Sequence, residues 1–418
     1  MHYRSYMDDR ITVPHGRVAD LTGRNFPETV MLAAENDIMT DAGPLVSAGD
    51  TVKSGQLVWE SLHGEEHSVY SSVSGTVLSV FGSEGMTRIE ISNDGLHTPA
   101  PDCSPYSGKL KDATKEDICS IARKAGIVEG SGIMEFLFEK LGKSPSRKDS
   151  LIIDCIGQNA YLPVPGGIAR ERCASMINGI KILMMATGAR KAYVVAEDSG
   201  EGTLDHLREL ASKAGFIRVF GLRSGRIDYP HRVTREMVRE LTCDSAGEYE
   251  VFDPEACCDL FRAFSKGSPC ISRTIAVGGD CIGRPGIITV PLGTRISDVI
   301  RISGGLTKKA GAVILGDPLS GEWVTDQNET VSKTTDAVYV LSEELLHREP
   351  AGPCIRCGKC NEACRYGVVP AYIVRNAGAG RHKEMYGAEN CVGCGFCSYV
   401  CPCGIDIMAE IRRVKTHL

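Results

Sequence analysis

The chain has 418 residues, of which 42% are hydrophobic and 24% are charged, and its formal net charge is −6. This composition is typical of a globular protein of two to four domains, and the mild acidity argues against nucleic acid as a partner. No run of residues approaches the roughly 18 apolar positions of a membrane-spanning helix, and residues 1–10 lack the apolar core of a secretory signal. We therefore expect a cytoplasmic protein without a membrane span, either free or peripheral at the inner face of the membrane.

The chain contains 18 cysteines. Eight of them form two motifs near the C-terminus, and the others are mostly scattered singly. Disulfide frameworks belong to secreted proteins, so this use of cysteine indicates a reducing, anaerobic cytoplasm.

Residues 28–95 consist of short alternating segments separated by glycines, for example at Gly49, Gly55 and Gly75. This spacing predicts a small β sandwich, and the pattern resembles the barrel-sandwich fold of biotinyl and lipoyl domains. Those domains carry a modified lysine at a hairpin tip, whereas residues 61–67 contain no lysine. We therefore interpret this domain as a scaffold and not as a swinging-arm carrier.

Residues 112–215 alternate between helix and strand patterns. Thr114 is a suitable N-cap, with Asp117 at the third helical position, for a helix that ends near Ala125. Residues 150–154 and 192–196 are short apolar strands, while residues 171–188 and 203–214 have helical periodicity. This alternation predicts a partly parallel sheet in an α/β domain.

A glycine-rich stretch, residues 126–132, lies inside this region. Gly126, Gly130 and Gly132 precede a helix that we expect to start near Ile133. Backbone N–H groups at such a helix start would cradle a phosphate. An ordinary turn explains the same glycines at least as well.

Residues 216–270 carry few signals. Cys257 and Cys258 are adjacent, which fits a redox pair or, more simply, two packing residues on a helix. Residues 271–342 predict a compact β-rich module with strands at 273–278, 287–291, 312–315 and 337–341. A short helix at 296–302 should end at Gly304 and Gly305.

Two cysteine motifs near the C-terminus give the strongest signal in the chain. The spacing C-x2-C-x2-C-x3-C occurs at residues 354–364 and again at 391–401. In two-cluster ferredoxin modules the fourth cysteine of each motif ligates the other cluster. We therefore assign one [4Fe-4S] cluster to Cys354, Cys357, Cys360 and Cys401, and a second to Cys391, Cys394, Cys397 and Cys364.

Structural zinc is the alternative interpretation of these cysteines. Zinc sites usually take two separated pairs of ligands, whereas each motif here offers three cysteines plus one. Cys403 is a further thiol beside Cys401, and its simplest interpretation is a small buried residue. Helices are expected at residues 370–376 and 407–414.

The order of these parts resembles RnfC, the peripheral subunit of the Rnf ion-translocating electron-transport complex. The resemblance covers nearly the whole chain and is best over residues 49–56, 180–198, 290–305, 316–318 and 354–415. It implies a multidomain α/β and β architecture with four parts. These are a barrel-sandwich domain (1–105), an α/β domain similar to the flavin- and NADH-binding subunit of respiratory complex I (106–270), an SLBB-like β-grasp module (271–345) and a two-cluster ferredoxin-like module (346–418).

In that family NADH reduces FMN, and FMN reduces the clusters. The resemblance makes Gly126, Gly130, Gly132, Glu197 and Asp198 the candidate flavin and NADH contacts. The family's flavin loop reads close to G-x-G-G-A-x-F-P, but here Ser131 replaces a glycine, Ile133 replaces an alanine and the proline is absent. Because of this altered loop, the chain resembles the divergent RnfC-like proteins that accompany amino-acid reductases, such as proline reductase, more than it resembles a membrane-complex subunit.

Several functions remain open. The chain is either an NADH-dependent oxidoreductase component with bound FMN or a flavin-free cluster relay. In both cases its partners are redox proteins, namely an amino-acid reductase or Rnf-type membrane subunits. A third hypothesis is thiol chemistry at Cys155, which would require a lowered thiol pKa; the alternative is a buried, inert cysteine.

Overall fold

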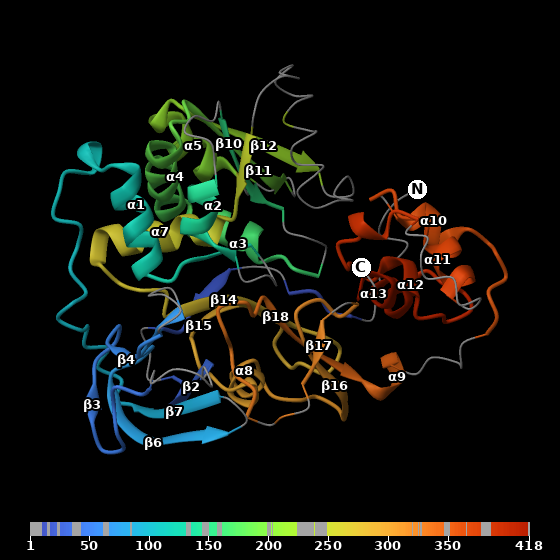
Figure 1. The fold of residues 1–418 in the computed structure, drawn as a ribbon, viewed down its shortest axis with the longest axis horizontal. Helices are drawn as coiled ribbons and strands as arrows, with labels where there is room; N and C mark the ends of the chain where they lie inside the picture. Colours follow the sequence, from blue (N-terminus) through green and yellow to red (C-terminus); the bar gives the residue numbers. More distant parts are fainter. Residues whose placement is uncertain are drawn as a thin grey trace.

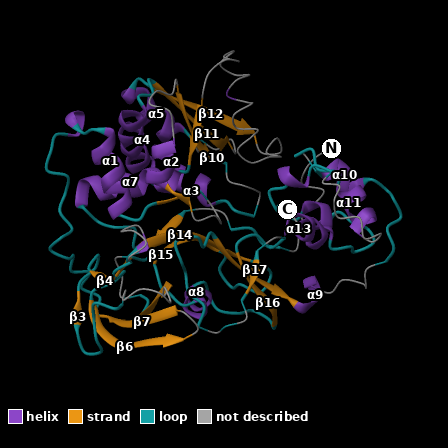
Figure 2. Cartoon of the chain, in the orientation of Figure 1, coloured by secondary structure: helices purple, strands orange, loops and turns teal. Residues whose placement is uncertain are grey.

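The computed structural model describes most of the chain in one continuous arrangement. It describes residues 11–14, 17–22, 26–35, 43–61, 67–83, 86–130, 135–143, 150–156, 161–198, 202, 204–223, 238, 249–319, 321–324, 326, 328–346, 352–364, 366–377 and 386–416. Figure 1 shows an N-terminal β module (blue), a helix-rich α/β layer, a central sheet and a helical C-terminal module (red). Figure 2 shows that helices dominate the α/β layer and the C-terminal module, while strands form the rest.

The N-terminal module is a four-stranded sheet of order β2-β7-β6-β3, accompanied by the short pair β4 and β5. The strands are β2 Thr29–Glu35, β3 Thr51–Val52, β4 Leu57–Trp59, β5 Val69–Tyr70, β6 Gly75–Ser83 and β7 Met86–Asn93. Alternate residues of β7 are buried, and Ile89 and Ile91 pack with Val30 and Val58 in one core. This period of two is what a half-buried strand requires, so the predicted β module is confirmed. The expected hairpin tip at 61–67 lies mostly outside the described residues.

The α/β layer is built on a four-stranded sheet of order β12-β11-β10-β13, in which every neighbouring pair is parallel. Its strands are β10 Ser150–Cys155, β11 Lys191–Asp198, β12 Ile217–Arg223 and β13 Tyr249–Phe252. Its helices are α1 Lys115–Lys124, α2 Leu137–Lys143, α3 Val164–Glu171, α4 Cys173–Thr187, α5 Asp205–Ala214 and α7 Pro254–Lys266. The parallel sheet is therefore confirmed, although α3, β12 and β13 are elements that we did not predict, and the bounds of α7 around Cys257 and Cys258 were not predicted either.

Local signals fix the ends of the predicted helices. Thr114 Oγ1 accepts a hydrogen bond from the Asp117 N–H at 3.1 Å, and the Asp117 carboxylate accepts one from the Thr114 N–H at 2.9 Å. This reciprocal capping box starts α1 as expected. Helix α4 ends at Gly188, also as expected, in the left-handed conformation.

One predicted boundary is wrong. The helix expected near Ile133 begins at Leu137, as α2, and a strand pair precedes it: β8 Val128–Glu129 pairs with β9 Glu135–Phe136. Phe136 is buried against the α/β core while Glu135 is half-buried. This alternation belongs to a strand, and it keeps the chain extended beyond the glycines.

The central sheet has six strands in the order β1-β15-β14-β18-β16-β17. They are β1 Val18–Asp20, β14 Ser272–Gly278, β15 Gly286–Pro291, β16 Ala310–Leu315, β17 Glu322–Trp323 and β18 Ala337–Ser342, with helix α8 Ile296–Ile302 packed against them. The four predicted strands and the predicted helix are confirmed. β1 pairs in parallel with β15, so this segment before the N-terminal module completes the central sheet.

A buried ion pair joins the central sheet to the α/β layer. Arg273 on β14 contacts Glu255 on α7 at 3.0 Å and Asp336 at 2.7 Å, and these side chains are less than a tenth exposed. Removing one partner of such a pair would leave a buried charge uncompensated, at a cost of about 3–5 kcal/mol. The two parts are therefore held in a fixed relation.

The C-terminal module is a cluster of short helices. Its elements are α10 Lys359–Ala363, α11 Pro370–Ala377, the 3-10 turn η4 Ala388–Asn390, α12 Phe396–Tyr399 and α13 Ile407–Thr416, and α9 Glu343–Leu346 precedes them. Ile373, Ile407 and Ile411 form its small core, and the predicted helices at 370–376 and 407–414 are confirmed. Among the residues that the structure describes, no helix is both long and apolar enough to cross a membrane.

Candidate metal centre

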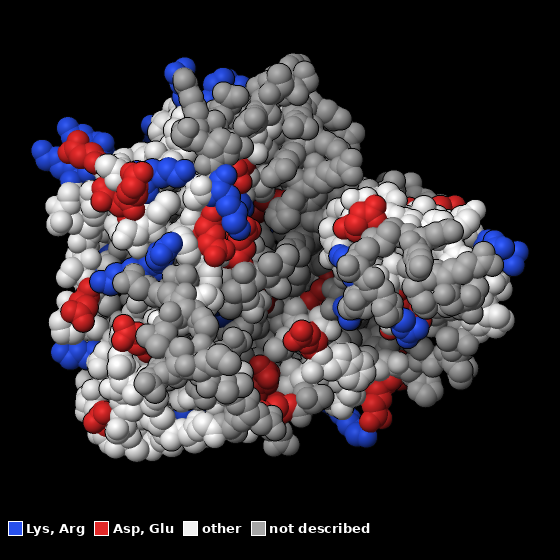
Figure 3. All heavy atoms as spheres, in the orientation of Figure 1, with Lys and Arg blue, Asp and Glu red and all other residues white. Residues whose placement is uncertain are grey.

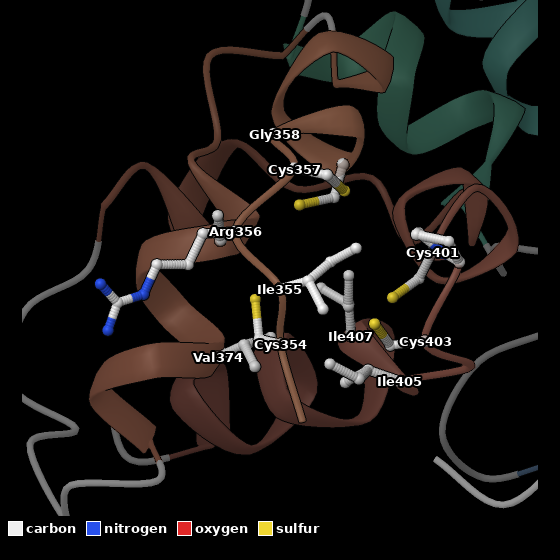
Figure 4. Close-up of a pocket in the computed structure, with 13 residues that line it drawn as sticks. Cys354, Ile355, Arg356, Cys357, Gly358, Val374, Cys401, Cys403, Ile405 and Ile407 are labelled. Atoms are coloured by element: carbon white, nitrogen blue, oxygen red, sulfur yellow. The ribbon is translucent and has the colours of Figure 1, made fainter. Parts of the chain in front are cut away.

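The first cysteine motif and the end of the second line one cavity. The cavity is bordered by the sulfur-bearing residues Cys354, Cys357, Cys360, Cys401 and Cys403 and by the apolar side chains of Ile355, Ala371, Val374, Ile405 and Ile407. Figure 4 shows the sulfurs of Cys354, Cys357, Cys401 and Cys403 around this space, while the Arg356 side chain points away from it. The structure thus brings Cys401, the last cysteine of the second motif, to the first three cysteines of the first motif.

The other four cysteines form a second group. Burial, together with the charges of Cys391 and Cys364, raises the pKa of the Cys394 thiol to about 11. Burial likewise raises the pKa of Cys397 to about 12, again with contributions from Cys394, Cys391 and Cys364. Cys364, from the first motif, therefore lies near Cys394 and Cys397 of the second motif.

The surroundings of these cysteines suit metal-bound thiolates better than free thiols. The Gly393 N–H points to Cys391 Sγ at 3.4 Å, the kind of backbone contact that stabilises a metal-bound thiolate. A metal-bound thiol is deprotonated, so bound iron would offset the burial that disfavours the thiolates. Within the described ranges, no three His, Cys, Asp or Glu side chains lie close enough to hold a single metal ion. A four-iron cluster is larger than one ion and holds its ligand sulfurs further apart.

Hydrogen bonds outside the cysteines fix the two loops. Asn361 Oδ1 accepts from the Ala371 N–H at 3.1 Å, and Ser398 Oγ accepts from the Met408 N–H at 2.8 Å. Lys415 Nζ donates to the Cys391 carbonyl at 3.0 Å. Each bond ties a cysteine-bearing segment to the neighbouring helix α11 or α13, so the ligand loops are held in place by structure beyond the ligands.

The candidate flavin residues are less well grouped. Gly126 ends helix α1: its φ is +60°, and its N–H donates to the Arg123 carbonyl at 2.9 Å. Gly130 follows β8 with φ +85° and has open space beside it, whereas Gly132 lies outside the described residues. Glu197 and Asp198 end strand β11, where Glu197 is exposed and Asp198 accepts a bond from Arg208 at 2.8 Å. Gly126 therefore has a capping role that needs no ligand.

Comparisons with known proteins bear on the identity of the chain. Family models match residues 17–95 ("RnfC Barrel sandwich hybrid domain"), 274–321 ("SLBB domain") and 353–405 ("4Fe-4S dicluster domain"). A subunit of the Na(+)-translocating ferredoxin:NAD(+) oxidoreductase complex of Acetobacterium woodii is 27% identical, covering 83% of this chain and 81% of that protein. The chain is an RnfC-like protein.

Other similar proteins include a second subunit of this type and a reductase. A subunit of the proton-translocating ferredoxin:NAD(+) oxidoreductase complex of Clostridium ljungdahlii is 26% identical, covering 83% of this chain and 78% of that protein. "Cobalamin reductase PduS" of Salmonella typhimurium is 24% identical, with 72% of each chain covered. A solved NAD+-reducing [NiFe]-hydrogenase aligns with a TM-score of 0.49 and 15% identity over 73% of this chain and 62% of that chain.

This RnfC-like chain has buried carboxylates where an α/β fold commonly binds nucleotides. That place is the edge where the strand order reverses, here between β10 and β13, outside the carboxyl ends of the strands. Glu129 is only 4% exposed; its Oε1 contacts Lys140 Nζ at 2.9 Å and accepts from the Asp253 N–H at 2.8 Å. Glu129 Oε2 has no hydrogen-bond partner among the described residues.

The carboxylates of Glu129 and Asp253 determine whether the phosphate of FMN could bind at this edge of the sheet. Asp253 follows β13 directly and caps helix α7 by accepting from the Glu255 N–H at 2.7 Å. Burial, and next the charge of Glu129, raise the pKa of Asp253 to about 7. An anionic phosphate would meet buried negative charge and a helix start already capped by its own chain. The described residues here therefore do not fit FMN phosphate. Sequence reasoning missed both carboxylates, although Asp253-Pro254 is a recognisable helix start.

The hypothesis that Cys155 is a reactive thiol is wrong, because this side chain is buried. Cys155 is fully buried beneath α4, and its Sγ lies 3.8 Å from Met176 Sδ. Burial raises its pKa well above the ordinary value, which is opposite to what a reactive thiol needs. Cys257 and Cys258 are also buried, on α7, and burial raises the pKa of both. They are packing residues, which was the simpler of the two interpretations.

Proposed function

We propose that this RnfC-like chain transfers electrons one at a time through two [4Fe-4S] clusters, from NADH as the ultimate donor to a partner reductase or membrane complex. The proposed ligands are Cys354, Cys357, Cys360 and Cys401 for the first cluster, and Cys391, Cys394, Cys397 and Cys364 for the second. The exchange of the fourth cysteines between the two loops supports this assignment above all. Two separate zinc sites would not need that exchange.

The proposed clusters have only one kind of chemistry available. A cluster whose irons are all ligated by protein thiolates has no open position for an organic substrate, so it accepts and donates single electrons. Cys354 and Cys357 are exposed, whereas Cys397 is buried. The first cluster is therefore accessible to a partner protein at the surface of the module.

The names of similar proteins suggest the partners. Two of those proteins are subunits of ferredoxin:NAD(+) oxidoreductase complexes and one is a cobalamin reductase. We propose that the redox partner here is a protein of one of two kinds, a soluble reductase such as an amino-acid reductase or the membrane subunits of an Rnf-type complex. In the second case the chain would lie peripherally on the cytoplasmic face of the membrane.

A second candidate function is a cluster relay that binds no flavin of its own. The unpartnered carboxylate oxygen of Glu129 and the buried Asp253 favour it, because they occupy the nucleotide edge of the sheet. In this case a partner protein would deliver the electrons. The two candidates share the clusters and differ only in the source of electrons.

One experiment tests both levels of the proposal. The protein is purified anaerobically, and iron, acid-labile sulfide, zinc and flavin are measured on the same sample. About eight iron atoms with one FMN supports NADH oxidation by this chain, and about eight iron atoms without flavin supports the relay. Zinc in place of iron overturns the cluster assignment. Cys360→Ser should lower the iron content, while Cys119→Ser, on helix α1, is the matched control and should keep it.

A further inference from the structure

We propose that the carboxylate of Asp317 lowers the reduction potential of the second cluster, and that this cluster faces the body of the protein, meaning residues 11–346. The inference rests on the ligand assignment proposed above. It assigns a role to the loop at residues 316–321, which leads from β16 to β17 and contributes no cluster ligand. Asp317 would act through its charge and would not bind iron.

The loop touches the backbone that carries the second cluster. A Cβ atom at Gly395 would lie 2.6 Å from the Leu319 carbonyl oxygen, closer than real Cβ contacts come. Gly395 stands between Cys394 and Cys397 and is the N-cap of α12. Figure 1 shows α12 and α13 on the side of the module nearer to β17, with α10 and α11 beyond them. The body therefore meets the module at the second ligand loop.

Asp317 is held firmly within this loop. Its side chain is 5% exposed, and its Oδ1 accepts from the Leu319 N–H. Its own carbonyl accepts from the Gly321 N–H at 2.6 Å. The residue whose side chain orders the loop is thus bonded to Leu319, the residue whose carbonyl meets Gly395.

Asp317 lies between the second ligand loop and strand β18 of the central sheet. On one side its carboxylate is bonded to Leu319, which meets Gly395 of the second ligand loop. On the other side lies Tyr339 of β18, whose pKa is raised by burial and then by the charge of Asp317. Tyr339 in turn donates from its hydroxyl to the Tyr161 carbonyl at 2.6 Å, and the two rings meet edge to face at 6.0 Å. Tyr161 follows β10 of the α/β layer, so these contacts run from that layer to the second ligand loop.

A buried negative charge near a cluster disfavours reduction. Reduction adds one electron, and hence one negative charge, to the cluster, and the buried position of Asp317 limits screening by water. The first cluster lies by the exposed Cys354 and Cys357 on the other ligand loop, so the same charge affects it less. The two clusters therefore differ in potential partly because only one of them is next to Asp317.

The test compares Asp317→Asn with Glu322→Gln by redox titration of the anaerobic protein, followed by electron paramagnetic resonance. Asn keeps the acceptor for the Leu319 N–H and removes only the charge, while Glu322 is an exposed carboxylate on the neighbouring strand. Signals are assigned to clusters from their change in Cys354→Ser and Cys391→Ser. We expect Asp317→Asn to raise the midpoint potential of the second cluster only, and Glu322→Gln to leave both unchanged.

Three outcomes would overturn the inference while the iron content stays near that of the wild type. These are unchanged potentials in Asp317→Asn, an equal rise in both clusters, and a rise confined to the first cluster. If Asp317→Asn loses iron, Asp317→Ser provides the same comparison, because serine also accepts from the N–H two residues on. A wild-type protein without iron would instead overturn the proposed function.

Discussion

Cys401 lines the same cavity as Cys354, although the other three cysteines of the second motif stand between them in the sequence. Cys364 makes the reverse exchange, since its charge acts on Cys394 and Cys397. The two cysteine loops therefore lie close together in both directions, which supports the proposal that each cluster takes ligands from both motifs. Around the module, acidic side chains lie beside the hollow that separates it from the α/β layer (Figure 3).

The proposed sharing of ligands predicts how single ligand substitutions group. Cys401→Ser should alter the same spectral signal as Cys354→Ser, and Cys364→Ser should alter the same signal as Cys391→Ser. Low-temperature electron paramagnetic resonance of the reduced variants measures this, together with iron content. The idea fails if Cys401→Ser groups with Cys391→Ser, because each motif would then serve its own cluster.

The contact between the module and the body predicts a difference between two glycines in the second ligand loop. Gly395 and Gly393 both have positive φ, at +74° and +78°, but only Gly395 lies against the body. Alanine should cost about 1–3 kcal/mol at either position through backbone strain, with an additional loss at Gly395 from overlap with Leu319. The thermal unfolding midpoint of the anaerobic protein should therefore be lower for Gly395→Ala than for Gly393→Ala. Equal midpoints would mean that the contact does not contribute.

Much of this architecture could be predicted because its signals are local. The capping box at Thr114, the stop at Gly188 and the β-rich module at 271–342 each depend on neighbouring residues, and all are confirmed. The spacing of the cysteines likewise indicates clusters, because this spacing lets one short loop present three thiolates to the same cluster. The predicted assignment of each ligand to a cluster stays a prediction.

The remaining features depend on contacts between distant segments. Leu319 and Gly395 meet only after the central sheet and the C-terminal module have packed together. Glu129, on β8, and Asp253, after β13, likewise become one acidic site only when the two strands are packed close enough for the Asp253 N–H to donate to Glu129 Oε1. The glycine stretch at 126–132 was predicted to lead into a helix, but tertiary packing of Phe136 makes a strand there. No local pattern contains this information.

The packing of α4 on α7 predicts a severe effect at Gly179. A Cβ atom there would lie 1.9 Å from the Cys257 carbonyl, so the helices would have to separate. Gly179→Ala should lower the free energy of unfolding by about 1–3 kcal/mol or more. Gly142, in α2, has open space beside it, so Gly142→Ala should be neutral or stabilising by up to about 1 kcal/mol. Chemical denaturation of both variants measures the contrast, and a mild effect at Gly179 would contradict the close approach of α4 and α7.

Asp253 predicts a pH dependence of stability. Its pKa is raised to about 7 in the fold by burial and by the charge of Glu129, against about 4 for an ordinary carboxyl. Between these values the folded state binds more protons than the unfolded state. The free energy of unfolding of the wild type therefore falls, on account of Asp253, as pH rises from about 4 to about 7. Asp253→Asn keeps a good N-cap and removes the titration. The variant should gain stability relative to wild type as pH rises from 5 to 8, on the order of 1.4 kcal/mol for each unit by which the pKa is raised within that range. The exposed Asp102→Asn is the control and should follow the wild type; a constant difference between Asp253→Asn and wild type at all pH values would show that Asp253 does not titrate in this range.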